Sequence, residues 1–448
     1  MKRTKVKEIL ASEKAGGNFL IAGWVRSLRK AQNVDFIDLV DGSSLAGLQI
    51  VVDSTTRGFE LLEKIYTGCS IYAQGTLVDS PGKGQRFELK ASEITMLGQA
   101  DPDTYPIQKK KHTMEFLRQK AHLRVRTNTF AAIFRLRSHL SLGIHDFFSS
   151  KGFFYIHTPV ITTSDCEGAG EMFRISVPGE KEFFDRPAYL TVSGQLEAEL
   201  LALGLGEVYT FGPTFRAENS NTARHLAEFW MVEPEMAFYD ARDNQDLAEE
   251  FLQKLLAYML KHAGEDLEFM ERWYQPGLVA QLESIAARPF ERISYTEAVK
   301  LLKASGKAFE YPCEWGADIQ TEHERYLTEE KIKGPVIVFD YPAKIKPFYM
   351  RLNDDGETVA AMDVLLPRIG EIIGGSQREE RLDVLKRRIQ KLGLNEEPYW
   401  WYLDTRRFGT VIHSGFGLGV ERTLLFLSGM ANIRDVIPFP RTPGNAEF

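Results

Sequence analysis

The stretch FGPTFRAENSNTARHLAEFWMVEPEMAF, residues 211–238, decides how this sequence is interpreted. Alternating apolar residues occupy both of its ends, and a polar loop at residues 219–225 separates them. This pattern predicts two long antiparallel strands joined by a solvent-exposed loop. Arg216 and Glu218 are two residues apart, so we expect them on the same face of the first strand. Taken alone, such a pair is most simply a surface salt bridge.

Length and composition are those of an ordinary globular protein. The chain has 448 residues, 44% hydrophobic and 26% charged, which is enough for two or three domains. No apolar run approaches the ~18 residues that span a bilayer, so we expect no membrane segment. Cys69, Cys166 and Cys313 form no metal-ligand or disulfide spacing, which suggests a cytoplasmic protein. The net charge of −7 does not indicate nucleic-acid binding, but a local basic surface would suffice.

Residues 1–99 form the first predicted domain. Five short strand-like segments lie between residues 18 and 98, with a helical stretch at 58–66 after the third. This is the element order of the OB-fold, a small barrel that commonly binds single-stranded nucleic acid. Phe36 offers a stacking surface and Gln49 a hydrogen-bonding amide. Phe36 could also be a core residue, and the fold alone does not identify a ligand.

The remaining chain is predicted to be a linker and a larger domain. The polar, proline-punctuated stretch 100–126 is the linker or hinge, and residues 127–448 form the second domain, with a helical insertion at 243–330. A long helix is expected at 127–149, followed by the strand GFFYIHTPVI around Pro159. Because proline cannot donate to a ladder, Pro159 marks a sheet edge or a kink. An interface with a second copy and ordinary core packing both explain the apolar residues here.

The segment SGFGLGVERTLLFLSG, residues 414–429, is a second candidate anion site. Its alternating glycines precede a helix expected to begin near Glu421, where the positive end of the helix dipole favours negative charge. Val420 replaces the third glycine of a dinucleotide fingerprint, so that interpretation fails. Upstream, Asp363 and Glu371 flank a turn, and such a pair suits Mg²⁺ bound to phosphates. Without other support, these two acids are most simply solvated.

These segments resemble, in order, the three motifs of class II aminoacyl-tRNA synthetases, and most closely the asparaginyl members of the aspartyl, lysyl and asparaginyl subgroup. The segment before Pro159 is similar to motif 1, FRAE with its return strand to motif 2, and GFGLGVER to motif 3. The resemblance implies an α+β protein, with an N-terminal OB-fold β-barrel and a catalytic domain of mainly antiparallel sheet flanked by helices. It also implies a homodimer formed through the motif 1 region near Pro159.

The resemblance implies an ATP site built from motifs 2 and 3. Arg216 matches the arginine that bridges the amino-acid carboxylate and the α-phosphate, a bidentate task that suits a guanidinium. Arg422 matches the arginine that holds the γ-phosphate, and Glu371 matches the principal metal ligand. The other implied contacts are Asp363 with the metal, Glu218 and Phe229 with adenine, His225 with a phosphate or the tRNA acceptor stem, and Gly417 and Gly419 along the nucleotide.

The resemblance also implies a pocket for asparagine. Arg378, seven residues after Glu371, matches the arginine that grips the side-chain oxygen. Ala198 stands where aspartyl enzymes carry a lysine, and Glu199 matches the residue that accepts from the asparagine amide. A missing cation and an added anion disfavour a carboxylate ligand. The other implied pocket residues are Ser193, and Gln195 and Glu167, which would hold the α-ammonium group.

On the barrel, the resemblance implies an anticodon site made of Arg26, Arg29, Phe36 and Gln49. We therefore expect ATP-dependent attachment of L-asparagine to tRNA(Asn) through an asparaginyl-adenylate, with Mg²⁺ accompanying ATP. The nearest alternative is an aspartyl-tRNA synthetase, whether or not it distinguishes the two tRNAs. An enzyme that makes asparagine without tRNA is disfavoured by the intact barrel. A non-catalytic RNA-binding module is disfavoured because Arg216, Glu371 and Arg422 are all present.

Overall fold

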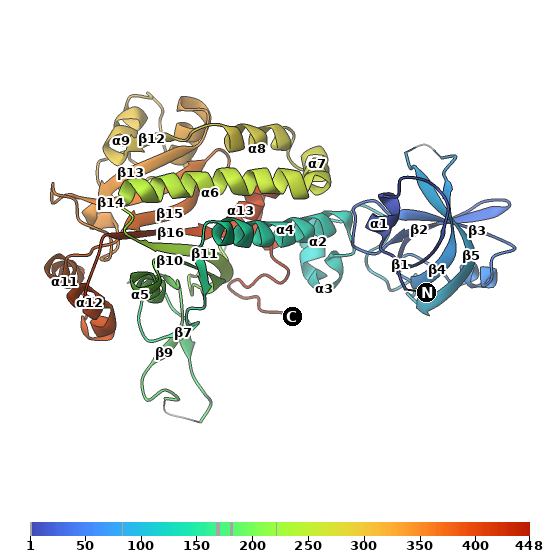
Figure 1. Cartoon of the computed structure of the whole chain (residues 1–448), viewed down its shortest axis with the longest axis horizontal. Coiled ribbons are helices and arrows are strands. Elements are labelled where there is room, and N and C mark those ends of the chain that lie inside the picture. Colours follow the sequence, from blue (N-terminus) through green and yellow to red (C-terminus); the bar gives the residue numbers. More distant parts are fainter. Residues whose placement is uncertain (1, 83, 167–170, 180–181, 221) are drawn as a thin grey trace. The chain divides into compact units, whose positions relative to one another are not determined.

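A computed structural model describes residues 2–82, 84–166, 171–179, 182–220 and 222–448 (Figure 1). The chain divides into two compact units, Met1–Ala132 and Ile133–Phe448. The first unit is built around a small barrel and the second around a large sheet. All of the predicted linker, 100–126, falls within the first unit, and the domain limits at 99 and 126 remain predictions.

Five strands close into a barrel in the order β1-β2-β3-β5-β4. They are β1 (Asn18–Lys30), β2 (Val34–Val40), β3 (Leu48–Asp53), β4 (Ser70–Asp79) and β5 (Phe87–Gly98), with the 3-10 helix η1 (Phe59–Glu63) between β3 and β4. Alternate side chains point inward, so Ile37 and Leu39 of β2 are fully buried while Phe36 lies on the outer face. The predicted OB-fold is confirmed, and Phe36 is not a core residue.

Three short helices complete the first unit: α1 (Val6–Leu10), α2 (Met114–Gln119) and α3 (Ala121–Arg124). Helix α1 places Val6 and Ile9 in the barrel core. Thr113 caps α2, because its hydroxyl accepts from the Phe116 N–H at 3.2 Å. Most of the predicted linker after Met114 is therefore helical.

The second unit is organised around an eight-stranded sheet of order β12-β13-β14-β15-β16-β11-β10-β6. Its strands are β6 (Phe154–Ile156), β10 (Glu207–Phe215), β11 (Glu228–Ala237), β12 (Glu291–Ser294), β13 (Val336–Pro342), β14 (Thr358–Leu366), β15 (Gly370–Gln377) and β16 (His413–Gly419). Only the outermost pairs, β10 with β6 and β12 with β13, are parallel. A smaller sheet joins β7 (Ile161–Thr162), β9 (Ala188–Leu190) and β8 (Arg174–Ile175). The expected mainly antiparallel sheet is confirmed.

Helices flank this sheet. They are α4 (Asn128–Ser150), α5 (Gln195–Leu205), α6 (Ala241–His262), α7 (Gly264–Trp273), α8 (Leu278–Ala287), α9 (Tyr295–Lys303), α10 (Thr321–Arg325), the π-helix η2 (Tyr326–Lys331), η3 (Ala343–Ile345), α11 (Leu382–Lys391), η4 (Glu397–Tyr399), α12 (Trp400–Arg407), α13 (Val420–Ser428) and η5 (Ile433–Asp435). Helix α6 crosses strands β14, β15 and β16 (Figure 1). It begins after Asp240, whose carboxylate caps the first turn by accepting from the Arg242 and Asp243 N–H groups.

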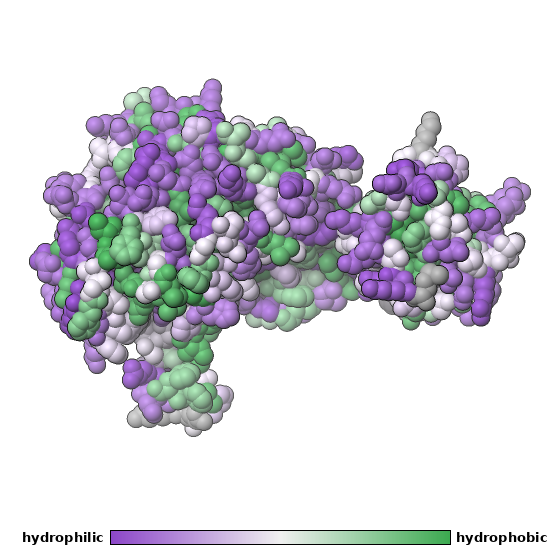
Figure 2. Space-filling view, viewed as in Figure 1, coloured by the Kyte–Doolittle hydropathy of each residue, from purple (hydrophilic) through white to green (hydrophobic). Residues whose placement is uncertain are grey.

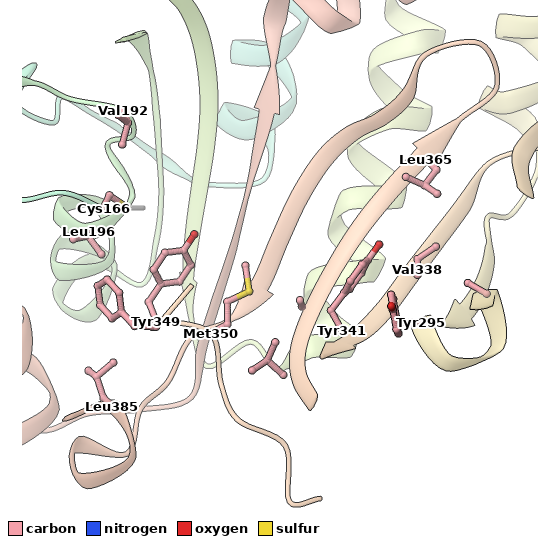
Figure 3. Close-up of a cluster of buried hydrophobic side chains, with 14 of the residues drawn as sticks. Cys166, Val192, Leu196, Tyr295, Val338, Tyr341, Tyr349, Met350, Leu365 and Leu385 are labelled. Atoms are coloured by element: carbon pink, nitrogen blue, oxygen red, sulfur yellow. The ribbon is translucent and has the colours of Figure 1, made fainter. Parts of the chain in front are cut away.

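One large apolar core of the second unit lies beside β13 and β14 (Figure 3). Figure 3 shows Tyr341, Val338 and Tyr295 close together on one side of this core, and Tyr349 and Met350 toward the other. Burying a large apolar side chain stabilises the fold by ~1.5–3 kcal/mol. Tyr349 and Met350 also line a cavity, so core packing fixes one of its walls.

Hydrophilic residues dominate the surface in Figure 2, with hydrophobic residues scattered among them. Each helix in the described part of the chain is too short or too polar to cross a lipid bilayer. Cys69, Cys166 and Cys313 are free thiols.

Three elements differ from the sequence predictions. The insertion 243–330 is not purely helical, because it also supplies β12, a four-residue strand too short to show a pattern. The strand near motif 1 covers only Phe154–Ile156 and ends before Pro159. Strand β10 ends at Phe215, so Arg216 and Glu218 follow it, although the Arg216 N–H still donates to the Ala227 carbonyl at 3.0 Å.

Candidate active site

A cavity of about 260 Å³ opens on the sheet where β11, β15 and β16 lie side by side. Its wall also includes the start of α5 and the segment after η3. The lining residues are Val192, Ser193, Gln195, Arg216, Met231, Glu233, Glu235, Lys346, Pro347, Tyr349, Met350, Asp363, Glu371, Gly374, Gly375, Arg378, Phe416 and Gly417. Residues predicted for ATP, the metal and asparagine therefore meet in one place.

Strand β11 contributes one face of side chains to this cavity. Met231, Glu233 and Glu235 are two residues apart and all line it, because alternate strand residues share a face. Phe229 precedes them in the same alternation, and the Arg216 guanidinium carbon lies 5.4 Å from its ring centroid. This is a cation–π distance. The arginine and the aromatic residue predicted to bind ATP are therefore neighbours.

Glu233 is held by the segment that starts α5. The Ser193 hydroxyl donates to one of its oxygens, and the Gly194 N–H donates to the other at 3.0 Å. A side chain at position 194 would not fit, because a Cβ there would lie 2.2 Å from Thr158 Oγ1. Burial raises the pKa of Glu233, and the two hydrogen bonds oppose that rise. Glu233 is thus a fixed, buried acceptor on the cavity wall.

Arg378 is bound to Glu235 at the same wall. Its Nε donates to Glu235 Oε2 at 3.1 Å, its Nη2 donates to the other carboxylate oxygen, and its Nη1 donates to Ser376 Oγ at 3.0 Å. The two side chains are 3% and 0% exposed. Burial opposes the charge of Arg378, but Glu235 and Glu199 outweigh it and raise the pKa of this guanidinium. The pocket's arginine is therefore already neutralised by a carboxylate.

Among the described residues, Glu199 is not one of those that line the cavity, and its contact with the substrate amide remains a prediction. Its Oε1 accepts from Gln195 Nε2 at 3.0 Å. Its Oε2 accepts from the Tyr402 hydroxyl at 2.7 Å and from Arg406 Nη2 at 2.6 Å. The side chain is fully buried, and although burial alone would raise it, the pKa of Glu199 is lowered by Arg406 and His413. Glu199 therefore supports Gln195, whereas Glu233 lies on the cavity wall.

Asp363 and Glu371 converge over Gly374. A Cβ at position 374 would lie 3.2 Å from Glu371 Oε1 and 3.5 Å from Asp363 Oδ1, so the absence of a side chain leaves space between the two carboxylates. This donor set fits Mg²⁺ bound to a phosphate chain. No group of three or more His, Cys, Asp or Glu side chains among the described residues could hold a metal, so phosphate and water would have to complete the shell.

Arg422 lies beside Glu371 at the start of α13. Its Nη1 is 3.4 Å from Glu371 Oε2 and donates to the Glu371 carbonyl at 3.2 Å. Burial works to raise the pKa of Glu371, but Arg422 and then Lys346 outweigh it, and this pKa is lowered. The motif 3 arginine and the predicted metal ligand therefore form one electrostatic unit.

The motif 3 glycines make room for β11. A Cβ at Gly415 would lie 2.2 Å from the Glu235 carboxyl carbon, and one at Gly417 would lie 2.7 Å from Met231 Cε. The lack of side chains at Gly415 and Gly417 thus lets β16 lie close to Glu235 and Met231 of β11. Gly419 ends β16, and a Cβ there would meet only Arg422, at 3.8 Å or more.

The other predicted ATP contacts lie away from the cavity lining. His225 Nδ1 is 2.6 Å from Thr222 Oγ1 within its own loop. Glu218 is half-buried in the same loop. Glu167 lies outside the described residues. The roles of these three residues remain predictions.

The anticodon residues lie together on the outer face of the barrel. The Arg29 guanidinium carbon is 4.3 Å from the Phe36 ring centroid, and Gln49 Nε2 donates to Glu88 Oε2 at 2.8 Å. Arg26 is engaged differently, because its Nε and Nη2 donate to Asp38 at 2.6 and 3.1 Å. That bidentate pair ties Arg26 to the barrel surface, and the anticodon role of all four residues remains a prediction.

Several functional residues were missed from the sequence. Glu233 and Glu235 could have been recognised, because acids are rarely found among the buried apolar residues of a strand. Lys346 follows η3 directly, and nothing in its local sequence pattern indicated a site. Arg406 and Tyr402 are brought to Glu199 by α12, more than 200 residues away in the sequence, and this contact has no local signal.

Two family models match the chain. Residues 113–443 match the class II tRNA synthetases of the D, K and N group, and residues 19–97 match an OB-fold nucleic acid binding domain. The first match covers most of the chain and includes the whole cavity described above. The chain belongs to the class II tRNA synthetase family of the aspartyl, lysyl and asparaginyl group.

Within this family the similarity is to asparagine enzymes. The chain is 56% identical to the asparagine–tRNA ligase of Oleidesulfovibrio alaskensis, with 100% of both chains covered. It is 58% identical to the asparagine–tRNA ligase of Solibacter usitatus over 98% of each. The asparaginyl-tRNA synthetase of Pyrococcus horikoshii, solved with asparaginyl-adenylate, superimposes with a TM-score of 0.90 at 32% identity, covering 100% of this chain and 99% of that one. The resemblance stated from the three motifs is confirmed.

Proposed function

We propose that this protein attaches asparagine to tRNA(Asn) in two steps, through an asparaginyl-adenylate. The observation that carries the proposal is the cavity in which Glu233 and the Arg378–Glu235 pair lie beside Arg216 and Glu371. The full-length asparagine–tRNA ligase relatives support the same substrate. They do not favour the aspartyl alternative.

Adenylation brings the carboxylate of an amino acid against the α-phosphate of ATP, so cations must separate two anions. Arg216 lines the cavity and takes this role, and Arg422 holds the far end of the triphosphate. Asp363 and Glu371 would hold Mg²⁺, which when bound neutralises and orients the phosphates. In the second step the same positioning presents the adenylate to the 3′-hydroxyl of the tRNA.

Asparagine is selected over aspartate by charge. An aspartate side chain would bring a third carboxylate beside Glu233 and Glu235, and Arg378 already donates to Glu235. An asparagine amide instead donates to Glu233 and accepts from Arg378, which satisfies both of its polar atoms. A buried like-charge contact costs several kcal/mol, which exceeds the ~3 kcal/mol that gives a hundredfold preference. We assign the amide acceptor to Glu233, with Glu199 supporting Gln195.

The barrel would bind the anticodon through Phe36, Arg29 and Gln49. A base stacked on Phe36 would gain about 1–3 kcal/mol. An enzyme that makes asparagine without tRNA does not need this surface, and the barrel matches a nucleic-acid-binding family.

We also propose a homodimer formed at the motif 1 edge of the sheet. Strand β6 ends the sheet order there, and Phe154 and Tyr155 are 53% and 46% exposed. An exposed apolar sheet edge favours pairing with another chain. A second cavity of about 340 Å³, lined by Tyr155, Pro159 and Trp230 among others, lies at the same edge and adjoins Glu233. A cytoplasmic location is likewise our proposal, consistent with three free cysteines.

Amino-acid-dependent exchange of pyrophosphate into ATP tests this function. Asparagine should support exchange and aspartate should not, and Arg216→Ala should abolish it. Near-native exchange by Arg216→Ala would refute the role of that arginine. Exchange that is faster with aspartate than with asparagine would refute the substrate.

A further inference from the structure

Lys346 places an ammonium group at the carboxylates assigned to the metal. Its Nζ lies 3.0 Å from Asp363 Oδ2 and 3.9 Å from the centroid of the Tyr341 ring. The two charged side chains are only 17% and 16% exposed, so solvent screens the pair poorly. Asp363 is therefore already neutralised by a residue of the chain.

The backbone around Lys346 is fixed by a buried arginine. Arg388 of α11 donates through Nη2 to the carbonyls of Lys346 at 3.1 Å and Pro347 at 2.8 Å. It also donates to the carbonyls of Ala343 at 3.4 Å and Phe348 at 3.2 Å. Arg388 is 8% exposed, and all of these acceptors are backbone carbonyls of one short segment, residues 343–348.

Burying a guanidinium is costly, and carbonyl acceptors offset that cost less well than a carboxylate would. Packing alone does not need such an arrangement, because an apolar side chain could fill the same volume. What the four hydrogen bonds accomplish is to fix the shape of segment 343–348, and with it the direction in which Lys346 leaves the backbone. Lys344, two residues earlier in the same segment, is exposed.

We propose that Lys346, positioned by Arg388, is the resident counter-ion of Asp363 in the ligand-free enzyme, so that a divalent cation must compete with it for this carboxylate. The free enzyme then binds metal weakly, and strong binding awaits a triphosphate, whose charge attracts both the metal and the released ammonium group. Lys346 thereby couples metal loading to nucleotide loading. The proposal rests on the assignment of Asp363 and Glu371 to the metal in the proposed function.

Binding of Mn²⁺ to the full chain without ATP, followed by the electron paramagnetic resonance signal of the free ion, tests this coupling. Lys346→Met should bind Mn²⁺ about tenfold tighter than the parent, because a competing charge at short range is gone. Lys344→Met, the matched control in the same segment, should bind it as the parent does. Lys346→Gln carries the same expectation if the methionine variant does not fold.

Asp363→Asn separates this proposal from the function on which it rests. Asp363→Asn should weaken Mn²⁺ binding. In the Asp363→Asn background, Lys346→Met should no longer increase the affinity for Mn²⁺. If Asp363→Asn weakens binding but Lys346→Met does not tighten it, the counter-ion proposal fails and the metal assignment stands. If Asp363→Asn leaves Mn²⁺ binding unchanged, the metal assignment itself fails, and the counter-ion proposal with it.

Arg388→Met tests the positioning role. It should tighten Mn²⁺ binding in the same direction as Lys346→Met but by less, because a loosened segment holds the ammonium group less well. In the Lys346→Met background it should add nothing. Arg388→Lys keeps the positive charge but loses the several N–H donors of the guanidinium. Its Mn²⁺ affinity should lie between those of the parent and Arg388→Met. A stability loss in Arg388→Met with unchanged Mn²⁺ binding would show that Arg388 is only structural.

Discussion

Glu199→Gln distinguishes a buried support from a direct substrate ligand. The structure gives the carboxylate hydrogen bonds from Gln195 at 3.0 Å, Tyr402 at 2.7 Å and Arg406 at 2.6 Å, with no exposed surface. A glutamine keeps the size but presents an NH₂ group to donors. The Arg406 guanidinium, itself 0% exposed, would lose its carboxylate partner.

The expected cost is large because a buried charge is left without its counter-ion. Removing one partner of a buried pair destabilises by about 3–5 kcal/mol, which corresponds to a fall of roughly 10 °C in the melting temperature of the catalytic unit. The lowered pKa of Glu199 likewise indicates that its negative charge stabilises the folded protein. Its stabilisation is present above the unfolded-state value, near 4.5, and is lost as pH falls toward the folded-state value. At neutral pH, Glu199→Gln should therefore lower the stability of the protein in the way that protonation of Glu199 lowers it in acid.

The assay compares Glu199→Gln with Glu233→Gln, since Glu233 faces the cavity. Thermal unfolding and asparagine-dependent pyrophosphate exchange are measured on both. Glu199→Gln should lose mainly stability, whereas Glu233→Gln should raise the KM for asparagine by about a hundredfold with a smaller change in melting temperature. The reasoning is wrong if Glu199→Gln melts like the parent and specifically loses affinity for asparagine.

Three further predictions concern separate parts of the molecule. Phe36→Ala should raise the KM for tRNA about 10–100-fold, as expected for one lost stacking contact, while pyrophosphate exchange without tRNA stays unchanged. Gly374→Ala should weaken Mg²⁺·ATP binding with little change in melting temperature, because the new Cβ would stand between Glu371 and Asp363; unchanged ATP affinity by calorimetry would contradict this. Burial raises the pKa of Glu197 to about 7, so between about pH 4.5 and 7 the unfolded chain binds fewer protons at this site and stability falls as pH rises. Glu197→Gln should flatten that decline, measured as the difference in urea midpoint between variant and parent at pH 5 and pH 8.

The fold could be predicted from the sequence wherever local pattern carried the information. The element order of residues 18–98 correctly predicts the barrel, and the helix predicted at 127–149 is found at Asn128–Ser150. The sequence left open whether Phe36 is a core residue, and the structure places Ile37 inside and Phe36 outside. β12 could not be predicted, because four residues between two helices acquire strand geometry only by pairing with β13. The shape of segment 343–348 could not be predicted either, because it depends on hydrogen bonds from Arg388 of α11, some 40 residues later in the sequence.

The candidate site was predicted unevenly for a related reason. Arg216, Glu371 and Arg378 follow from motif and spacing, and all three line the cavity. Glu199 was predicted to contact the substrate amide, and a linear spacing could not show that α12 also brings Arg406 and Tyr402 to that carboxylate. Lys346 escaped notice because its significance depends on Asp363, a partner on β14.

Buried charge explains why these residues act together. Glu199, Glu233 and Glu235 are all at most 5% exposed. Arg378 forms an ion pair with Glu235, and Arg406 forms one with Glu199. Glu233 accepts from two neutral donors, Ser193 and Gly194. Burial still raises its pKa, so these hydrogen bonds offset only part of the cost of burying it. An incoming amide N–H relieves that cost and an incoming carboxylate increases it. If Glu233 selects the substrate as proposed, pairing it with a new internal cation would stabilise the fold at the expense of specificity.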